Sequence, residues 1–278
     1  MEKYDIFIQA GQSNAEGFGR GEISVPFVPD DRICYLTKPA VIPYVIGVPL
    51  GSPDIYNRND PCTITVAQER KDDSCSENDR LGDFSLTFAK EYIQAGLLAP
   101  DRKLLIIRCA VGGTGFVYNQ WEMDAPLYTR MLDMTDYALA LNPENRLMGM
   151  LWHQGEHDAY EGNPPARYKK QVLEMIDSVR NRYGSPNLPF ICGGFCYEWV
   201  QQYLKNATEI MQMLREIAAE RDGIYIETDD LLSNHEKTGE NGIGDDVHFC
   251  RDSLYVMGCR YFDAYQKIIR RRNGLDTF

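Results

Sequence analysis

The 278-residue chain has no apolar run long enough to cross a bilayer, and it has few basic residues for its size. A membrane-spanning helix needs about 20 mostly apolar residues in a row, so no membrane partner is expected. The chain holds 29 lysine and arginine residues against 41 aspartate and glutamate residues, a net charge of −12. Since a nucleic-acid-binding surface replaces counterions with basic side chains, no nucleic-acid partner is expected either.

The chain also lacks a CxxC motif and a recognisable secretory leader. Residues 1–11 show no basic stretch followed by an apolar one. The eight cysteines are scattered, whereas a disulfide framework is typical of short exported proteins. We therefore expect free, buried thiols and a cytoplasmic protein. A homo-oligomer is compatible with the sequence but is not indicated by any motif.

Short apolar runs alternate with helical patterns along most of the chain. Their near-continuous apolar character indicates strands that are covered on both faces. The five predicted strands are 4–10, 103–110, 147–153, 189–195 and 223–228. Helical spacing of apolar residues follows at 166–184, 203–220 and 254–268. This alternation predicts a doubly wound α/β sandwich.

Residues 20–82 interrupt the alternation. They are rich in proline, aspartate, glycine and asparagine, with two short β-like pieces at 32–38 and 62–68. We interpret this stretch as an insertion over the rim of the sheet, inside a single domain of residues 1–278.

Polar or glycine-rich loops follow four of the predicted strands, at 11–14, 112–115, 154–157 and, further on, 245–248. In an open parallel sheet, ligands bind beyond the carboxyl ends of the strands. Ser13 is a candidate nucleophile there, and a serine hydroxyl needs a base to become reactive. His248 is the candidate base, with Asp245 placed to fix its tautomer. Taken singly, Ser13 also fits a helix N-cap and His248 a surface histidine.

Two further features fit acyl transfer. Gly112 and Gly113 allow backbone N–H groups to face a developing oxyanion, and Gln154 can add a side-chain amide donor. The alternatives are a plain turn for the glycines and a strand-end hydrogen bond for Gln154. A nucleotide site is disfavoured because the chain has neither GxGxxG nor GKS or GKT.

The stretch His153-Gln-Gly-Glu-His157 offers a rival interpretation. It matches the H-x-x-E-H pattern of zinc proteases, which requires a helix to aim both histidines at one ion. Here the preceding residues predict a strand, so a zinc hydrolase is the minor hypothesis. A glycan-binding module without activity is the non-enzyme alternative.

The blocks GQSNAEG, CAVGGT, WHQGE and DDVH together resemble the SGNH-hydrolase superfamily. The resemblance is closest to acetylesterases of the sialate O-acetylesterase and carbohydrate esterase family 6 type, over residues 4–120, 147–158 and 245–265. It implies a three-layer α/β/α sandwich with a five-stranded parallel sheet of flavodoxin type. It also implies Ser13, Asp245 and His248 as the catalytic triad, with Ser13, Gly113 and Gln154 forming the oxyanion hole.

The resemblance implies a serine esterase that removes O-acetyl groups from a carbohydrate such as acetylxylan or a sialate. The partner is then an acetylated carbohydrate, and no metal or organic cofactor is needed. The predicted substrate-binding residues are Gln12, Trp121, Glu156 and His157. Trp121 could instead pack a loop. Glu156 could hydrogen-bond the Ser13 loop, position Gln154 or be a simple structural carboxylate. Two departures stand out: DDVH replaces the commoner Asp-Gly-x-His, and His157 replaces a small polar residue.

The cysteine pattern gives a direct prediction. Thiol titration of the denatured, unreduced protein should detect all eight cysteines as free thiols. Several stable disulfides would instead favour an exported protein.

Overall fold

The computed structural model describes residues 2–23, 25–39, 60–71, 80–239 and 244–274. Its centre is a seven-stranded sheet in the order β3-β2-β6-β1-β7-β8-β9. The strands are β1 (Tyr4–Gly11), β2 (Ile33–Thr37), β3 (Thr63–Val66), β6 (Lys103–Arg108), β7 (Arg146–His153), β8 (Phe190–Gly193) and β9 (Ile224–Ile226). All neighbours pair in parallel except β2 and β3, which are antiparallel. A separate ribbon is formed by β4 (Arg70–Lys71) and β5 (Arg80–Leu81).

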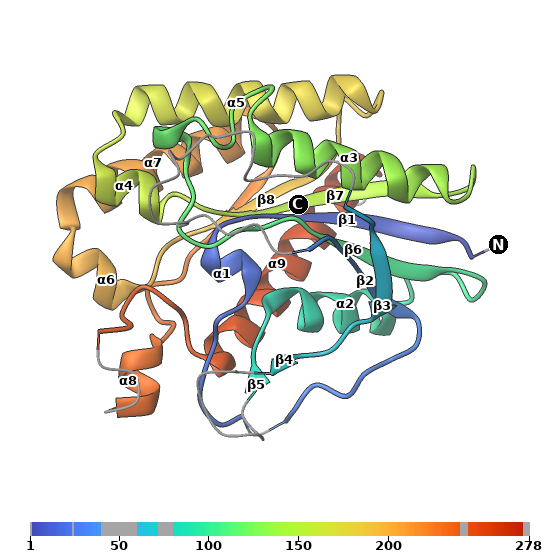
Figure 1. The fold of residues 1–278 in the computed structure, drawn as a ribbon, viewed down its shortest axis with the longest axis horizontal. Helices are drawn as coiled ribbons and strands as arrows, with labels where there is room; N and C mark the ends of the chain where they lie inside the picture. The colour runs from blue at the N-terminus through green and yellow to red at the C-terminus, as the bar shows by residue number, and fades with distance from the viewer. Residues whose placement is uncertain (1, 24, 40–59, 72–79, 240–243, 275–278) are drawn as a thin grey trace.

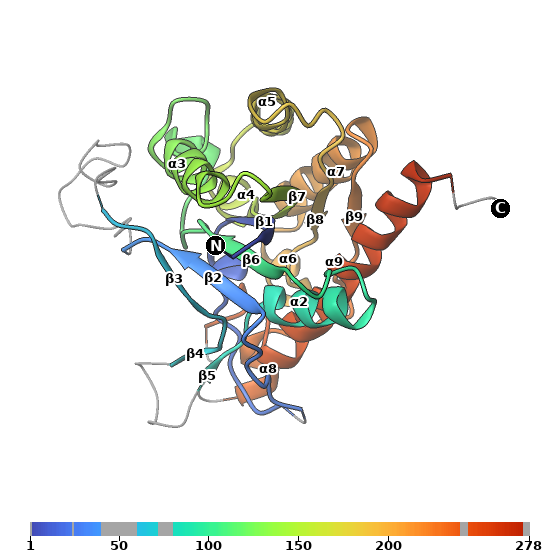
Figure 2. The same cartoon turned by 90° about the vertical axis from the view of Figure 1, so that its right-hand side faces the viewer.

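Helices cover both faces of this sheet (Figure 1). On one face lie α3 (Pro126–Ala140), α5 (Pro165–Arg182) and α7 (Leu204–Glu220). On the other lie α2 (Phe84–Gln94) and α9 (Arg251–Arg272), which pack against each other (Figure 2). The predicted α/β/α sandwich is therefore confirmed, and the predicted helices at 166–184, 203–220 and 254–268 correspond to α5, α7 and α9. The short helices are α1 (Ser13–Glu16), η2 (Phe116–Tyr118), α4 (Glu156–Glu161), α6 (Tyr197–Gln202) and α8 (Asn234–Thr238).

The strand count corrects the prediction of five. The two additional strands, β2 and β3, come from the segment 20–82, for which the sequence predicts an insertion over the rim. Residues 33–36 of β2 are buried and pair in parallel with β6, so this part of the segment belongs to the main sheet. The physical reason is that a strand of five residues carries a weak sequence signal, while pairing with β6 and β3 gives it a place in the sheet. The single-domain organisation stays a prediction.

The core is built around the central strand β1, which is buried along all eight of its residues. Phe7 of this strand packs edge-on against Phe88 of α2 and Tyr265 of α9, with ring centroids 4.8 and 5.1 Å apart. Aromatic rings prefer this geometry, and burial of such large side chains is a major stabilising contribution. Because β1 is held rigidly from both sides, its carboxyl end is a fixed support for the residues that follow.

Seven cysteines fall within the described residues, and all are free thiols: Cys34, Cys62, Cys109, Cys192, Cys196, Cys250 and Cys259. Burial raises the pKa of Cys109 to about 12, so this thiol is inert at neutral pH. In the described part of the chain, no helix combines the length and apolar character needed to cross a membrane. The cytoplasmic location stays a prediction.

Candidate active site

The site begins where β1 ends. Gly11 has φ +130°, and a Cβ on this residue would lie 2.0 Å from the carbonyl oxygen of His153. Only glycine therefore permits β1 and β7 to end this close together. The next N–H, of Gln12, donates to that same carbonyl at 3.0 Å. The chain then turns into α1, whose first residue is Ser13.

Ser13 lines a cavity of about 510 Å³ at the carboxyl edge of the sheet. The cavity brings together six of the predicted site residues, namely Gln12, Ser13, Gly113, Glu156, His157 and His248. Its apolar wall was not predicted, and it includes Phe18, Val111, Tyr160, Trp199 and Val247. The volume is that of a typical small-molecule site, with a few polar groups in a mainly apolar lining.

His248 and Asp245 form a pair at this cavity. His248 Nδ1 lies 2.5 Å from Asp245 Oδ1, and the imidazole stacks on the ring of Phe18 at 5.3 Å between centroids. A carboxylate accepts, so Nδ1 carries the proton and Nε2 keeps its lone pair. Burial raises the pKa of Asp245, but the bonds from His248 and Asn234 more than offset this, so its pKa is lowered. Asp245 therefore stabilises the fold as a carboxylate, and this contribution is lost as pH falls through the lowered pKa.

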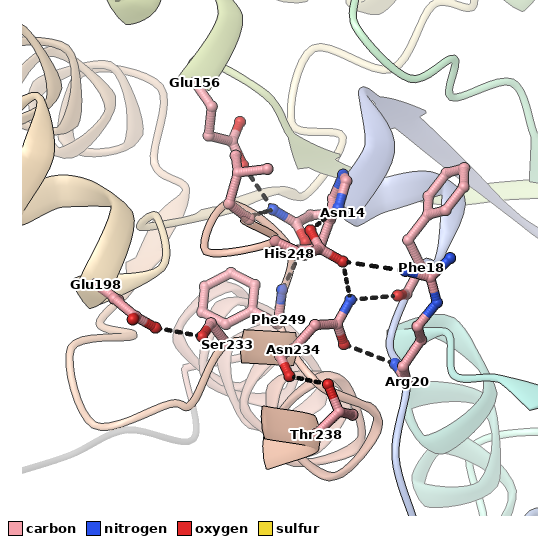
Figure 3. A network of polar contacts seen from close by, with 12 residues as sticks. Asn14, Phe18, Arg20, Glu156, Glu198, Ser233, Asn234, Thr238, His248 and Phe249 are labelled. Atoms are coloured by element: carbon pink, nitrogen blue, oxygen red, sulfur yellow. Dashed lines mark hydrogen bonds and ion pairs between the residues drawn. The ribbon is translucent and has the colours of Figure 1, made fainter. Parts of the chain in front are cut away.

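Asn234, which the sequence analysis missed, holds this pair in place (Figure 3). Its Nδ2 donates to Asp245 Oδ2 at 2.6 Å and to the Phe18 carbonyl at 2.9 Å. Its Oδ1 accepts from the Arg20 N–H at 2.7 Å, and its own N–H donates to the His248 carbonyl at 2.8 Å. Asn234 is fully buried. Nothing in the sequence distinguishes it from an ordinary helix-capping asparagine, since its partners lie more than ten residues away.

A second buried amide, Asn14, links the Ser13 helix to two other parts of the site. Its Nδ2 donates to Glu156 Oε1 at 2.8 Å and to the Val247 carbonyl at 2.9 Å. Its Oδ1 accepts from the Phe249 N–H at 3.1 Å (Figure 3). Glu156 therefore accepts a hydrogen bond from the residue next to Ser13, as one of the interpretations of its sequence position predicted.

Asp246 points elsewhere. Its Oδ2 accepts a hydrogen bond from the Gln202 amide at the end of α6. The aspartate in contact with His248 is Asp245, three residues before it, and not Asp246, two residues before it.

Gln154 requires a correction. Its side chain is fully buried and does not line the cavity. Its Nε2 lies 2.6 Å from Asp158 Oδ2, 3.2 Å from the Thr114 carbonyl and 3.3 Å from Gln12 Oε1. An amide has only two N–H donors. Three acceptors of the protein itself therefore compete for these two donors, so the amide is already engaged within the fold.

A second amide, that of Gln12, lies at the cavity. Gln12 Oε1 accepts from the His157 N–H at 3.1 Å and from the Gly155 N–H at 3.4 Å. Two backbone donors fix which end of the amide is oxygen. Because Oε1 is engaged by these backbone donors, Nε2 is the end of the Gln12 amide that remains as a candidate donor to a ligand.

Trp121 also requires a correction. The ring is fully buried and does not line the cavity, so it cannot stack on a sugar. Its Nε1 donates to Thr114 Oγ1 at 3.0 Å, and the ring meets Trp152 edge-on at 5.2 Å. Trp121 thus packs behind the glycine loop. On the cavity side, Tyr160 on α4 is about half exposed and offers an aromatic face instead.

The HQGEH stretch does not form a zinc-binding geometry. His153 ends a strand, whereas Glu156 and His157 begin α4, so the two histidines do not share a helix face. Within the described ranges, the one group of three His, Cys, Asp or Glu residues with convergent ligand atoms is Glu198, His235 and Asp246. The stretch is therefore no support for a zinc hydrolase.

The sheet order, the covering helices and the Ser13 cavity beyond the carboxyl ends of the strands are those of a three-layer α/β/α fold with a candidate site at the edge of its sheet. The family model for carbohydrate esterases described as sialic acid-specific acetylesterases matches residues 3–267, and the chain belongs to this family. The protein is an enzyme that hydrolyses carboxylic esters and removes O-acetyl groups from a carbohydrate.

Individual relatives agree with this assignment. A probable 9-O-acetyl-N-acetylneuraminic acid deacetylase of Escherichia coli (strain K12) is 26% identical over 233 residues, covering 72% of this chain and 69% of its own. The crystal structure of NanS superposes with a TM-score of 0.72 at 18% identity, over 97% of this chain and 98% of its own. A protein of Arabidopsis thaliana gives 0.67 at 17% identity, over 96% and 99%. At these identities the two structures show a shared fold.

The bonds of Asn234 lead to a testable prediction. Asn234→Asp replaces a donor to Asp245 by a second carboxylate 2.6 Å away, and like charges at this distance raise the pKa of one of them. The acid limb of the kcat/KM profile should move to higher pH, and kcat at neutral pH should fall roughly 10-fold or more. Asn206→Asp, on the outer helix α7, is the matched control. An unshifted pH profile for a folded Asn234→Asp enzyme would show that Asn234 is merely structural.

Proposed function

We propose that the enzyme deacetylates a sugar through an acetyl-serine intermediate on Ser13, with His248 as base and Asp245 as its orienting partner. The observation that carries the proposal is the Asp245–His248 pair, 2.5 Å apart, at the cavity that Ser13 lines. This arrangement supplies a nucleophile, a base with the correct tautomer and a space for the ester.

The proposed chemistry has two steps. In the first, His248 Nε2 takes the Ser13 hydroxyl proton while Oγ attacks the acetyl carbonyl, and the tetrahedral intermediate then expels the sugar oxygen. His248 returns the proton to that oxygen, which leaves as a hydroxyl. In the second step, His248 takes a proton from water, which attacks the acetyl-serine. The proton passes back to Ser13 as acetate leaves, so both residues end in their starting forms.

The oxyanion needs donors aimed at the position where negative charge develops. The Ser13 N–H is one, because the first N–H groups of a helix have no intrahelical acceptor. The Gly113 backbone, in a left-handed conformation with φ +66°, lines the same cavity and is the second. The Gln12 amide is the third, in place of Gln154.

The wall of the cavity suggests how the sugar is held. Tyr160 presents an exposed ring at the rim, while Trp199 and Phe18 contribute further aromatic surface. Aromatic faces pack well against the C–H surface of sugar rings, since both are apolar and flat. His157 lies at the same cavity, and burial lowers its pKa, so it is a neutral hydrogen-bonding group at pH 7.

Ser13→Ala tests the proposal directly. Removal of the hydroxyl should lower acetate release from an acetylated sugar by at least about 10³-fold, as loss of a triad member does. Mass spectrometry of the wild-type enzyme quenched during turnover should show a 42 Da acetyl adduct on Ser13, a mass that follows from the acetyl-serine chemistry itself. Ser185→Ala is the control for a serine outside the cavity. Near-normal turnover by folded Ser13→Ala protein would refute the proposal.

The two adjacent aspartates predict different losses. Asp245→Asn removes the acceptor of His248 Nδ1–H, favours the wrong tautomer and should lower kcat by roughly 10³–10⁴-fold. Asp246→Asn loses only the contact with Gln202 on the surface, so kcat should stay within about threefold of wild type. Steady-state kinetics of both variants decide between them. If both variants stay active, His248 works without a carboxylate partner.

Gln12 and Gln154 can be separated in the same way. Gln12→Glu keeps the acceptor for the His157 N–H but removes the amide donors, and kcat should fall roughly 10²–10³-fold with little change in KM. Gln154→Ala breaks a buried network and should mainly lower the free energy of unfolding, by about 1–3 kcal/mol. The reverse pattern, with full stability but low kcat for Gln154→Ala, would return the oxyanion role to Gln154.

A further inference from the structure

Glu16 is a charged side chain at the active-site cavity to which the proposed chemistry gives no role. It is the last residue of α1, three positions after Ser13, so both side chains lie on the same side of one helical turn. Glu16 lines the cavity that Ser13 lines, and its side chain is 30% exposed. A carboxylate beside a developing negative charge opposes that charge, so a carboxylate in this place must be compensated.

The Glu16 carboxylate binds the glycine loop, which we define as residues 112–115. Its Oε2 accepts a hydrogen bond from the Gly112 N–H at 2.9 Å. The loop lies directly against Ser13 at this point, because a Cβ on Gly112 would be 3.5 Å from the Ser13 Cβ. Glu16 thus joins the helix that carries Ser13 to the loop that faces it.

The main chain of Glu16 makes a second link to the same part of the sheet. Its carbonyl accepts a hydrogen bond from Arg108, the last residue of β6, and this strand leads into the glycine loop. Arg108 is itself paired with the buried Asp83 at 3.3 Å. The side chain and the main chain of Glu16 therefore both hold α1 against the segment that contains the loop.

Arg70 compensates the charge of Glu16. Its Nη1 lies 3.4 Å from Glu16 Oε1, and its Nη2 donates to the Gly17 carbonyl at 2.6 Å. The guanidinium also lies over the Phe18 ring, 4.7 Å from the ring centroid. Both oxygens of Glu16 are thus engaged inside the protein, one by Gly112 and one by Arg70. This arrangement suits a residue that holds the site together rather than one that binds a substrate group.

We propose that Glu16 is a positioning residue that ties the glycine loop to Ser13, so that the backbone of the loop is aligned with the carbonyl that Ser13 attacks. The proposal rests on the proposed function, because the loop affects the rate only if an oxyanion forms beside Ser13. Alignment of this kind acts in the transition state, so its loss lowers kcat with little effect on KM. A glutamine at position 16 retains an acceptor oxygen, whereas a methionine of similar length has none.

The first arm of the test measures kcat and KM on 4-nitrophenyl acetate. Glu16→Met should lower kcat roughly 10-fold or more with KM within about twofold, since a hydrogen bond to a charged acceptor is lost. Glu16→Gln should restore kcat to within about threefold of wild type. Glu174→Met, which replaces an exposed glutamate on α5, is the matched control and should leave both constants unchanged. Equal losses for Glu16→Met and Glu16→Gln, or a loss confined to KM, would overturn the proposal. Should Glu16→Met fail to fold, Glu16→Ala takes its place.

The second arm observes the hydrogen bond itself, through amide hydrogen exchange of Gly112 followed by nuclear magnetic resonance. The wild-type and Glu16→Gln proteins should protect this N–H, and Glu16→Met should exchange it roughly 10-fold faster or more. Equal exchange in the wild type and Glu16→Met would overturn the role of Glu16, even if Ser13 is the nucleophile. Undiminished turnover by Ser13→Ala, together with faster Gly112 exchange in Glu16→Met, would refute the proposed function and leave the contact between α1 and the loop as a structural one.

Discussion

The side chain of Asn14 is the buried group on which the arrangement of the site depends. Its amide nitrogen donates to Glu156 at 2.8 Å and to a carbonyl of the loop 247–249 at 2.9 Å, and its oxygen accepts from an N–H of that loop at 3.1 Å. These bonds join three segments that are more than 80 residues apart in the chain. Each bond that is lost leaves a buried polar group unpaired, at a cost of about 1–3 kcal/mol. The positions of Ser13 and His248 relative to each other therefore follow from one amide.

Local sequence patterns predicted those strands of the sheet whose own residues form a continuous apolar run. Continuous apolar runs at 4–10 and 147–153 can only be buried strands if helices cover both faces, and parallel strands place their polar exits at one edge. This reasoning indicated Ser13 and His248 as candidates, and both residues line the same cavity. The strand β2 was not assigned to the main sheet, because its neighbours in sequence are polar and its place in the sheet comes from tertiary pairing with β6 and β3. Propensity carries little weight when a tertiary contact supplies the burial.

The predictions for Gln154 and Trp121 failed for a related reason. Sequence position places a residue at the end of a strand or in a loop, but it does not determine the direction of the side chain. Asp158, two residues into α4, accepts from Gln154 at 2.6 Å and turns that amide inward. Thr114 accepts from the Trp121 ring and turns it behind the loop. Asp158 and Thr114 each accept a hydrogen bond from a buried donor. Since buried donors are almost always hydrogen-bonded, an acceptor inside the protein determines where such a side chain points.

The hydrogen-bond partners of buried side chains also explain why the HQGEH stretch resembles a metal motif but does not have the geometry of one. The Tyr261 hydroxyl donates to the Trp152 carbonyl at 2.8 Å, so it accepts from His153 Nδ1, 3.2 Å away. The proton of the neutral ring is then on Nδ1, and Nε2 faces Glu156 Oε1 at 3.4 Å. His153 therefore packs between Tyr261 and Glu156 inside the protein, where it does not face His157 across a shared ion. Burial raises the pKa of Glu156, but His153 and Asn14 lower it overall. The Glu156 carboxylate accepts from Asn14, and through this bond it supports the segment that presents Ser13.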